Sequence, residues 1–402
     1  MTTFPAIERQ EPQTALPVAG KRLEAVDALR GFAILSIMLL HNIEHFDLYY
    51  FPENLPGWIK AIDGVIWKTL FFLFGGKAYA IFALLFGLTF FIQFSNRQKK
   101  GFDFSGRFLW RLSLLFLFGI FNSIFYQGDI LAMYAVIGVV LIPVRKLPDR
   151  TVLVIAIFLM LQPLEWGKVV YSLLNPGFEP KNPLSWAYFE RAGQYLGEGS
   201  FARTAMGNIW NGRLAAVFWS AENGRFFQTA SLFMLGMLLG RWGRFALSAD
   251  NARFWRNALL ISAIAFIPLH VISESIPELI ARKAIRVPAG LIAASWSKFA
   301  FMVVLVSAFM LIFRSATGAK VLGKLSPLGR MSLSNYVMQS MLGSFIYYGF
   351  GLGLYKVTGA SYCLLIGIAL AIFQAAFSSW WMKSHRHGPL EYIWHKATWI
   401  RS

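Results

Sequence analysis

The chain has 402 residues, of which 56% are hydrophobic and only 14% are charged, whereas average soluble chains carry roughly 25% charged residues. Its net charge is +18, but the lysines and arginines lie in short connectors between long apolar runs, which argues against nucleic acid as a partner. Each run of about 20 apolar residues can cross a bilayer as a helix, so composition predicts a lipid bilayer as the surroundings rather than two soluble domains.

The apolar runs predict an all-α, polytopic membrane protein of about ten transmembrane helices. The predicted spans are 25–46, 64–94, 108–127, 129–147, 151–172, 224–241, 254–276, 288–313, 328–354 and 361–383. The Gly75–Gly76 pair predicts a break in the second run, with an interfacial helix before it and a span starting near Lys77. Residues 1–20 are polar, so no cleavable signal peptide is expected and the first run should act as an uncleaved anchor.

The connectors predict the orientation. Every second connector is rich in lysine and arginine, which indicates a bacterial cytoplasmic (inner) membrane protein with both termini in the cytoplasm. The basic connector at 277–287 is the exception to this alternation. The expected parts are a polar tail (1–22), an N-terminal membrane half (23–172), one long outer loop with short interfacial helices (173–223), a C-terminal membrane half (224–384) and a cytoplasmic tail helix (385–402).

The first predicted span carries the most informative polar residues. Positions 27, 30, 34, 38, 41 and 45 follow the three-four spacing of one helix face. Asp27 and Arg30 are one turn apart and can pair, and His41 follows Arg30 by roughly 16 Å along the axis. Ionisable groups at such depth are costly and mark functional sites. The alternative is an ion pair at the helix start with His41 packed against another helix.

Other polar residues in the predicted spans have two interpretations each. Glu165 is a candidate to hold or tune His41, and Lys77 either orients a substrate or extends to the interface. Capping of a helix is favoured for Asp129, and a helix contact for His270.

The C-terminal part adds further polar candidates. Asn335 and Gln339, one turn apart, either join helices or bind ligand. Cys363 is expected to be a small core residue, since a single thiol forms no internal disulfide. The sequence predicts no metal site, also not among the tail histidines, and it predicts a turn at 388–391 that packs a short tail helix beneath the membrane.

The first span resembles the opening motif of the acyltransferase 3 superfamily of membrane enzymes. In that superfamily Asp-x-x-Arg-Gly starts the first span and a histidine follows the arginine after ten intervening residues, as Asp27, Arg30, Gly31 and His41 do here. The resemblance implies that His41 is the catalytic base and that cytosolic acyl-CoA is the donor.

The rest of the chain is similar to the YeiB-like family, whose domains are catalogued as a domain of unknown function (number 418). The similar segments are Gly76-Lys77 with 84–87, 128–131 with 134–135, 329–336 with 339–340, Trp380-Trp381, and 388–391 with Trp394. This family is placed in the same broad superfamily as the acyltransferases and the lysosomal heparan glucosaminide acetyltransferase. In the YeiB-like family the position of His41 is more often Asn, and this chain has Asn42 immediately after it.

The resemblances favour transfer of an acyl group from cytosolic acyl-CoA to an extracytoplasmic hydroxyl or amine on a sugar, glycan or lipid-linked acceptor. The expected catalytic residues are His41, Asn42 and Glu165, the expected CoA-phosphate residues are Arg30, Arg107, Arg111 and Arg330, and the expected substrate residues are Asp27, Lys77, Asp129, His270, Asn335 and Gln339. The alternatives are a transporter or flippase without covalent chemistry, haem ligation by His41 and His270, and a purely structural role. The sequence leaves open a homodimer.

Overall fold

The computed structural model describes residues 23–399, which form helices and connecting turns, with no strand in that range. The N-terminal half contains α1 Glu24–Ile43, α2 Gly57–Phe74, α3 Ala78–Gln98, α4 Ser105–Ser123, α5 Leu131–Gly138, α6 Leu141–Val144, α7 Asp149–Met160 and α8 Pro163–Leu174. It is followed by α9 Leu184–Leu196, α10 Phe201–Gly207, the π-helix η1 Asn208–Gly212 and α11 Arg213–Glu222. The predicted all-α class is confirmed for this part of the chain, which has short helices within 173–223.

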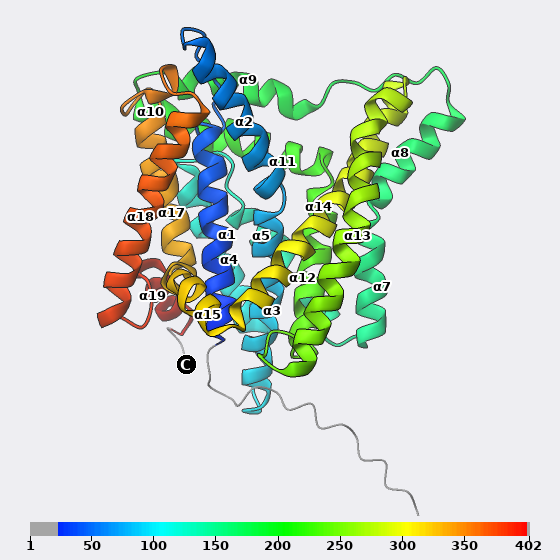
Figure 1. Ribbon diagram of the computed structural model, residues 1–402, viewed down its shortest axis with the longest axis vertical. Coiled ribbons are helices and arrows are strands. Elements are labelled where there is room, and N and C mark those ends of the chain that lie inside the picture. The colour runs from blue at the N-terminus through cyan, green and yellow to red at the C-terminus, as the bar shows by residue number, and fades with distance from the viewer. Residues whose placement is uncertain (1–22, 400–402) are drawn as a thin grey trace, which may run out of the picture.

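The C-terminal half consists of longer helices. They are α12 Arg225–Arg241, α13 Ala249–Leu279, α14 Lys283–Phe313, α15 Ala316–Leu322, the 3₁₀ turn η2 Gly323–Leu325, α16 Ser326–Arg330, α17 Ser332–Tyr347, the 3₁₀ turn η3 Leu354–Lys356, α18 Ala360–Ser384 and α19 Pro389–Thr398. The last helix, α19, lies within the segment 385–402 for which a tail helix was predicted. The start of α1 lies on the same side of the molecule as α15 and α19, and α9 and α10 lie on the opposite side (Figure 1).

Two breaks shape the N-terminal half. Gly76 adopts φ +76° in the turn between α2 and α3, so the predicted break at Gly75–Gly76 is confirmed. A second break divides the predicted span 151–172, because Gln162 is left-handed with φ +59° and Pro163 opens the next helix. The axes of α7 and α8 differ in direction by 47°.

Five helical stretches are long and apolar enough to cross a membrane: Glu24–Ile43, Gly57–Gln98, Ala249–Leu279, Lys283–Phe313 and Ala360–Ser384. They become six if the bent pair α7–α8 is one span. The best window of α13 has a mean hydropathy of 1.9, yet only 11% of it is buried within the protein. An apolar helix left so bare requires apolar surroundings, which makes the fold compatible with a membrane protein. Ten spans remain a prediction.

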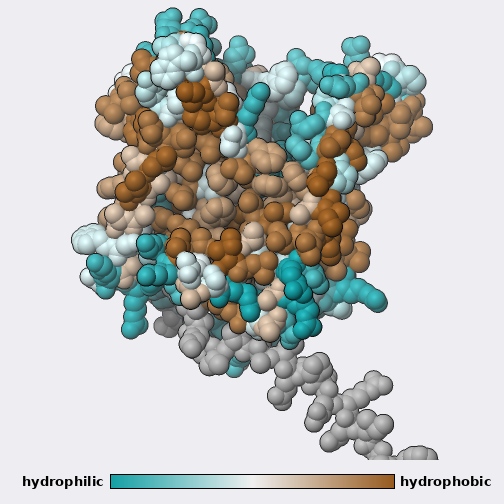
Figure 2. Space-filling view, viewed as in Figure 1, coloured by the Kyte–Doolittle hydropathy of each residue, from teal (hydrophilic) through white to brown (hydrophobic). Residues whose placement is uncertain are grey.

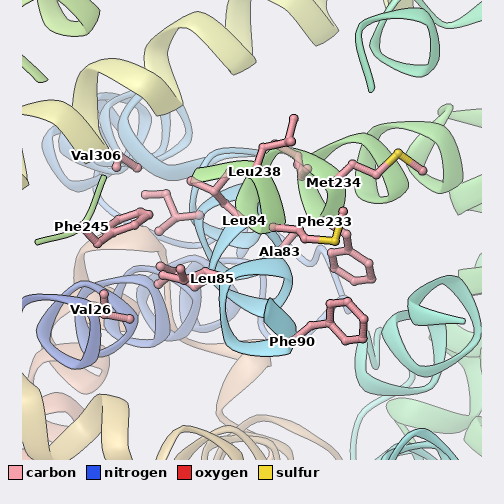
Figure 3. Close-up of a cluster of buried hydrophobic side chains, with 14 of the residues drawn as sticks. Val26, Ala83, Leu84, Leu85, Phe90, Phe233, Met234, Leu238, Phe245 and Val306 are labelled. Atoms are coloured by element: carbon pink, nitrogen blue, oxygen red, sulfur yellow. The ribbon is translucent and has the colours of Figure 1, made fainter. Parts of the chain in front are cut away.

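The apolar surface forms a broad band between hydrophilic margins (Figure 2). Inside, the largest buried cluster joins α1, α3, α12 and α14, with Val26, Leu84, Phe233 and Val306 among its members (Figure 3). This core fixes α3 and α12 side by side, so that the beginnings of both helices lie together.

Candidate functional site

The start of α1 is tied to two other helices through Arg30. Its guanidinium donates to the Asp27 carboxylate at 3.1 Å, to the Thr89 hydroxyl of α3 at 2.9 Å and to the Gly329 carbonyl at 3.4 Å. The expected Asp27–Arg30 pair therefore exists, and Arg30 also joins α1 to α3 and α16.

Two glycines explain why the segments around Arg30 and Gly329 lie so close. A β-carbon on Gly31 would lie 2.1 Å from the carbonyl oxygen of Leu325, and one on Gly329 would lie 1.8 Å from the carbonyl oxygen of Asp27. Only glycine permits such an approach of two backbones. The Asp-x-x-Arg-Gly segment and the Gly329-Arg330 segment, which are far apart in sequence, thus pack directly against each other.

The other end of α1 finishes in a strained turn. His45, Phe46, Asp47 and Tyr49 all have φ between +48° and +71°, a left-handed conformation that costs L-residues free energy and persists only where the surroundings impose it. The hydroxyl of Tyr348 donates to the Phe46 carbonyl at 2.7 Å. His45 Nε2 lies 2.9 Å from the Thr358 carbonyl and 3.2 Å from the sulfur of Cys363, so the turn is anchored to the C-terminal half.

This turn folds two carboxylates back toward His41. The Nδ1 atom of His41 lies 3.1 Å from the hydroxyl of Tyr126 and 3.6 Å from the Glu44 carboxylate. The same Tyr126 hydroxyl hydrogen-bonds the carboxyl group of Asp47, which lies beyond the end of α1. Burial, together with the negative charge of Glu44, raises the pKa of Asp47 to about 7.

The arrangement determines which imidazole nitrogen can act. When the Tyr126 hydroxyl donates a hydrogen bond to Asp47, the Tyr126 oxygen accepts a hydrogen bond from Nδ1–H of His41. All three side chains then have a hydrogen-bond partner. Nε2 then carries the lone pair and is the basic atom. The His41 side chain keeps 17% of its surface exposed, so a ligand can reach it. His41 and its surroundings therefore have the chemistry of an oriented general base.

The other two expected catalytic residues lie elsewhere. Asn42 is fully buried, donates to the Met38 carbonyl at 2.8 Å and accepts from the Tyr347 hydroxyl at 3.0 Å, which joins α1 to α17. Glu165 lies in α8, across the molecule from α1 (Figure 1), and pairs with Lys168 at 2.6 Å. The structure does not bring Glu165 to His41.

Two of the four expected phosphate-binding arginines hold the tail helix instead. Arg107 donates to the Thr398 carbonyl at 2.7 Å, and Arg111 donates to the Thr398 hydroxyl at 3.1 Å while its guanidinium lies 4.2 Å from the centre of the Trp394 ring. Their predicted location at the inner ends of spans, which Arg330 shares, indicated an anion site. Their contacts show that they anchor α19 to α4.

Three polar residues of the expected substrate set lie just before α5 and on α17. Asp129 accepts from the Asn122 amide and from the backbone N–H of Ala132, each at 3.0 Å, so it caps the start of α5. Asn335 donates to Ser378 at 2.9 Å and joins α17 to α18. Gln339 is fully buried, and neither of its amide atoms has a hydrogen-bond partner within residues 23–399.

Lys77 and His270 belong to a different cluster, on the turn between α2 and α3 and on α13. Lys77 donates to the Phe72 carbonyl at 2.6 Å, and the ring of Phe72 lies 5.7 Å from that of His270. His41 has Tyr126 and Phe46 as its ring neighbours, so the structure does not pair the two histidines as haem ligands. Within the described range, no group of three or more His, Cys, Asp or Glu residues could hold a metal ion.

A pocket of about 390 Å³ was not anticipated from the sequence. It lies where α3, α6 and α12 end and is lined by phenylalanines of α3 together with Arg145, Lys146 and Arg241. Arg145 lies 3.4 Å from Asp103 and Arg241 lies 2.6 Å from Asp149, so carboxylates already offset two of the three cations. The sequence had marked these basic residues only as indicators of orientation.

Residues 239–401 match the model of the family described as "Protein of unknown function (DUF418)". The chain is 28% identical to the uncharacterized protein YxaH of Bacillus subtilis, over 95% of this chain and 96% of that protein. It is 25% identical to the uncharacterized protein YeiB of Escherichia coli, over 94% of this chain and 96% of that protein. An uncharacterized 39.9 kDa protein of Bacillus acidopullulyticus is 22% identical over 96% of each chain. No solved structure matches significantly. The predicted resemblance to the YeiB-like family is thereby confirmed, with the family's own model matching the C-terminal part of the chain.

Proposed function

We propose that the protein is a membrane acyltransferase that moves an acyl group from acyl-CoA to a hydroxyl or amine acceptor, with His41 as the general base. The observation that carries the proposal is the chain of hydrogen bonds from Asp47 through Tyr126 to Nδ1 of His41. It leaves Nε2 as a basic nitrogen on a partly exposed ring at the end of α1.

The reaction follows from that basic nitrogen. Nε2 of His41 takes the proton of the acceptor O–H or N–H as the acceptor atom attacks the thioester carbonyl. The new acyl–oxygen or acyl–nitrogen bond forms, the carbon–sulfur bond breaks, and the proton passes from His41 to the departing thiolate of CoA. No redox partner is required, and atoms and charge balance.

The donor would enter from the side where α1 starts. Arg30 lies at that end of α1, and Gly329, the neighbour of Arg330 in the chain, packs against the same segment, whereas Arg107 and Arg111 bind the tail helix. Gln339 supports a ligand path between the two ends, because a buried amide without protein partners is an unusual cost unless a ligand or solvent engages it.

A transporter is the second candidate function. It is favoured by a hollow on the side of α9 (Figure 2), and by Lys77 and Arg225 at the beginnings of α3 and α12. Uptake of a substrate into proteoliposomes without acyl-CoA consumption would support it over the first.

The test is acyl-CoA consumption by purified protein over a range of acyl lengths and acceptors. His41→Gln should fold and lower turnover by roughly 100- to 10,000-fold, because a general base contributes that much. The matched control is His385→Gln, an exposed histidine beyond the end of α18, which should retain full turnover. Near-normal turnover in well-folded His41→Gln would rule out the base assignment.

A further inference from the structure

We infer that the structure contains a second ligand site, a binding site for a phosphate group, at the point where the starts of α3 and α12 meet α13 and α14. The site, called here the cation cluster, consists of Lys77, Arg225, Lys298 and Glu274. The cation cluster is separate from His41 and its partners Tyr126, Glu44 and Asp47, and the inference does not depend on whether His41 acts as a base.

Two cations of other elements lie within electrostatic reach of Lys298. Lys298 of α14 interacts with Lys77, which precedes α3, and with Arg225, the first residue of α12. The stem of Lys298 lies against the α2–α3 turn, since a β-carbon on Gly76 would lie 2.9 Å from its Cδ. Like charges gathered in this way repel each other, so the arrangement stores free energy that an anion would release.

The acidic groups around the cluster do not neutralise it. Glu274 of α13 is the one carboxylate found to interact with Lys298, and its side chain is exposed. Three cations against one carboxylate leave a net charge of +2. A phosphate monoester carries about −1.5 to −2 at pH 7, so its charge matches the cluster better than that of a single carboxylate.

The backbone at the start of α12 adds to the positive potential, whereas the start of α3 adjoins the end of α2, which carries the opposite partial charge. Lys77 and Arg225 lie where α3 and α12 begin, and these two long helices pack side by side. Helix starts carry unpaired N–H groups and about half a positive charge each. Lys77 is buried and donates to the Phe71 and Phe72 carbonyls at 3.3 and 2.6 Å, so it is held in place beside the helix start.

An aromatic wall lies next to the cations. Phe72, Phe266 and Phe301 contact one another with ring centres 4.9 to 6.1 Å apart, and the Lys77 ammonium lies 5.4 Å from the Phe301 ring centre. His270 stacks on Phe266 at 5.1 Å. The molecule is hollowed on this side, between the lobe of α2 and the lobe of α8, α13 and α14 (Figure 2). Such a wall suits an apolar part attached to the phosphate.

The ligand class is therefore a phosphate monoester, from either a lipid headgroup or a small soluble molecule. Two probes distinguish these sources: glycerol 3-phosphate, and phosphatidic acid presented in neutral detergent micelles. Binding is measured by calorimetry on the purified full-length chain, with glycerol as the uncharged comparison. Binding of both probes identifies the phosphate as sufficient, and binding of phosphatidic acid alone identifies a lipid ligand.

The decisive variant is Lys298→Gln, because this side chain has no hydrogen bond to other described residues, so the substitution removes none from the fold. It should weaken binding of the probe about 10-fold or more, the usual effect of losing one charge-assisted contact to an anion. The matched control is Lys68→Gln, an exposed lysine on α2, which should bind as the unaltered protein does. The inference is overturned if the unaltered protein binds neither probe, or if Lys68→Gln weakens binding as much as Lys298→Gln.

Discussion

At the scale of single residues, the hydroxyl of Tyr126 is the link between His41 and Asp47. Tyr126→Phe removes that hydroxyl and keeps the ring, which contacts the rings of His41 and Phe46 at 4.7 and 5.4 Å. We expect turnover of acyl-CoA to fall about 10- to 100-fold with unchanged KM for the donor, because the imidazole loses its orienting partner. Initial-rate kinetics check this, and an unaltered kcat in Tyr126→Phe would contradict the link.

Asp47 predicts a pH dependence at the same site. Its pKa is raised to about 7, so it is protonated below that pH and ionised above it. The ionised form is the stronger acceptor of the hydrogen bond from the Tyr126 hydroxyl, and turnover should therefore rise as pH increases through 7. Asp47→Asn should flatten this rise. A pH profile from 5.5 to 8.5 tests both statements, and an identical profile in the variant would speak against a role for Asp47.

Substitution of Gln339 distinguishes a side chain that contacts the ligand from one that only supports the fold. A buried amide without partners destabilises the protein, so Gln339→Met should leave the melting temperature unchanged or raise it. If the amide meets the substrate, the same variant should lose at least about 10-fold in turnover. Thermal unfolding and kinetics on one preparation measure both effects. Loss of stability would show that Gln339 is an ordinary structural contact.

Sequence spacing identified His41 but not its partners. Tyr126 is 85 residues away in the chain, and Asp47 reaches the site only because four residues after α1 adopt positive φ. None of those four is glycine, so no local signal marks the turn. Arg107 and Arg111 show the converse, since their clustering indicated an anion site although their partners are Thr398 and Trp394 of the tail.

At the scale of elements, the start of α17 is capped by a carboxylate that lies more than 50 residues later in the chain. Glu391 of α19 accepts from the backbone N–H of Leu333 and Ser334 at 2.7 and 3.2 Å and from the Ser334 hydroxyl at 2.5 Å. Leu390 in turn donates its N–H to Ser334 at 3.0 Å. The two sequence segments that resemble the family in this region therefore bind each other.

Removal of this cap should be measurable. Glu391→Gln weakens three hydrogen bonds at the start of α17, where a lost cap costs roughly 0.5–2 kcal/mol of unfolding free energy. We expect a lower melting temperature in detergent. Glu179→Gln, an exposed glutamate before α9, should leave it unchanged, and equal melting temperatures for both variants would contradict the capping role.

The sequence predicted where helices begin and end at positions where local residue chemistry determines the boundary. The glycine pair at 75–76 predicted the turn before α3, and long apolar runs predicted α13, α14 and α18. The bend at Gln162 was not predictable, because a glutamine adopts the left-handed conformation there under tertiary control. Its amide donates to the Gly224 carbonyl at 3.2 Å, a contact 62 residues away.

At the scale of the whole molecule, orientation in the membrane is the open prediction. The start of α1 and the helix α19 lie on the same side of the molecule (Figure 1), whereas Lys21, Arg22 and Arg401, which contributed to the predicted orientation, lie outside the described residues. A reporter active only in the cytoplasm should be active when fused after Ser402. The same reporter should be inactive when inserted in the turn 197–199, after α9. The reverse result would invert the topology and place His41 near the cytoplasm.

The cap supplied by Glu391 also bears on biosynthesis. The backbone N–H groups that begin α17 have their partner only after 57 further residues have been synthesised. Until residues 389–398 have been synthesised, α17 and α18 can be inserted and joined through Asn335 and Ser378, but the start of α17 has no cap from α19. The C-terminal half is therefore fully tied together only once α19 has been made, and a nascent chain stalled before Glu391 should remain a substrate for membrane proteases.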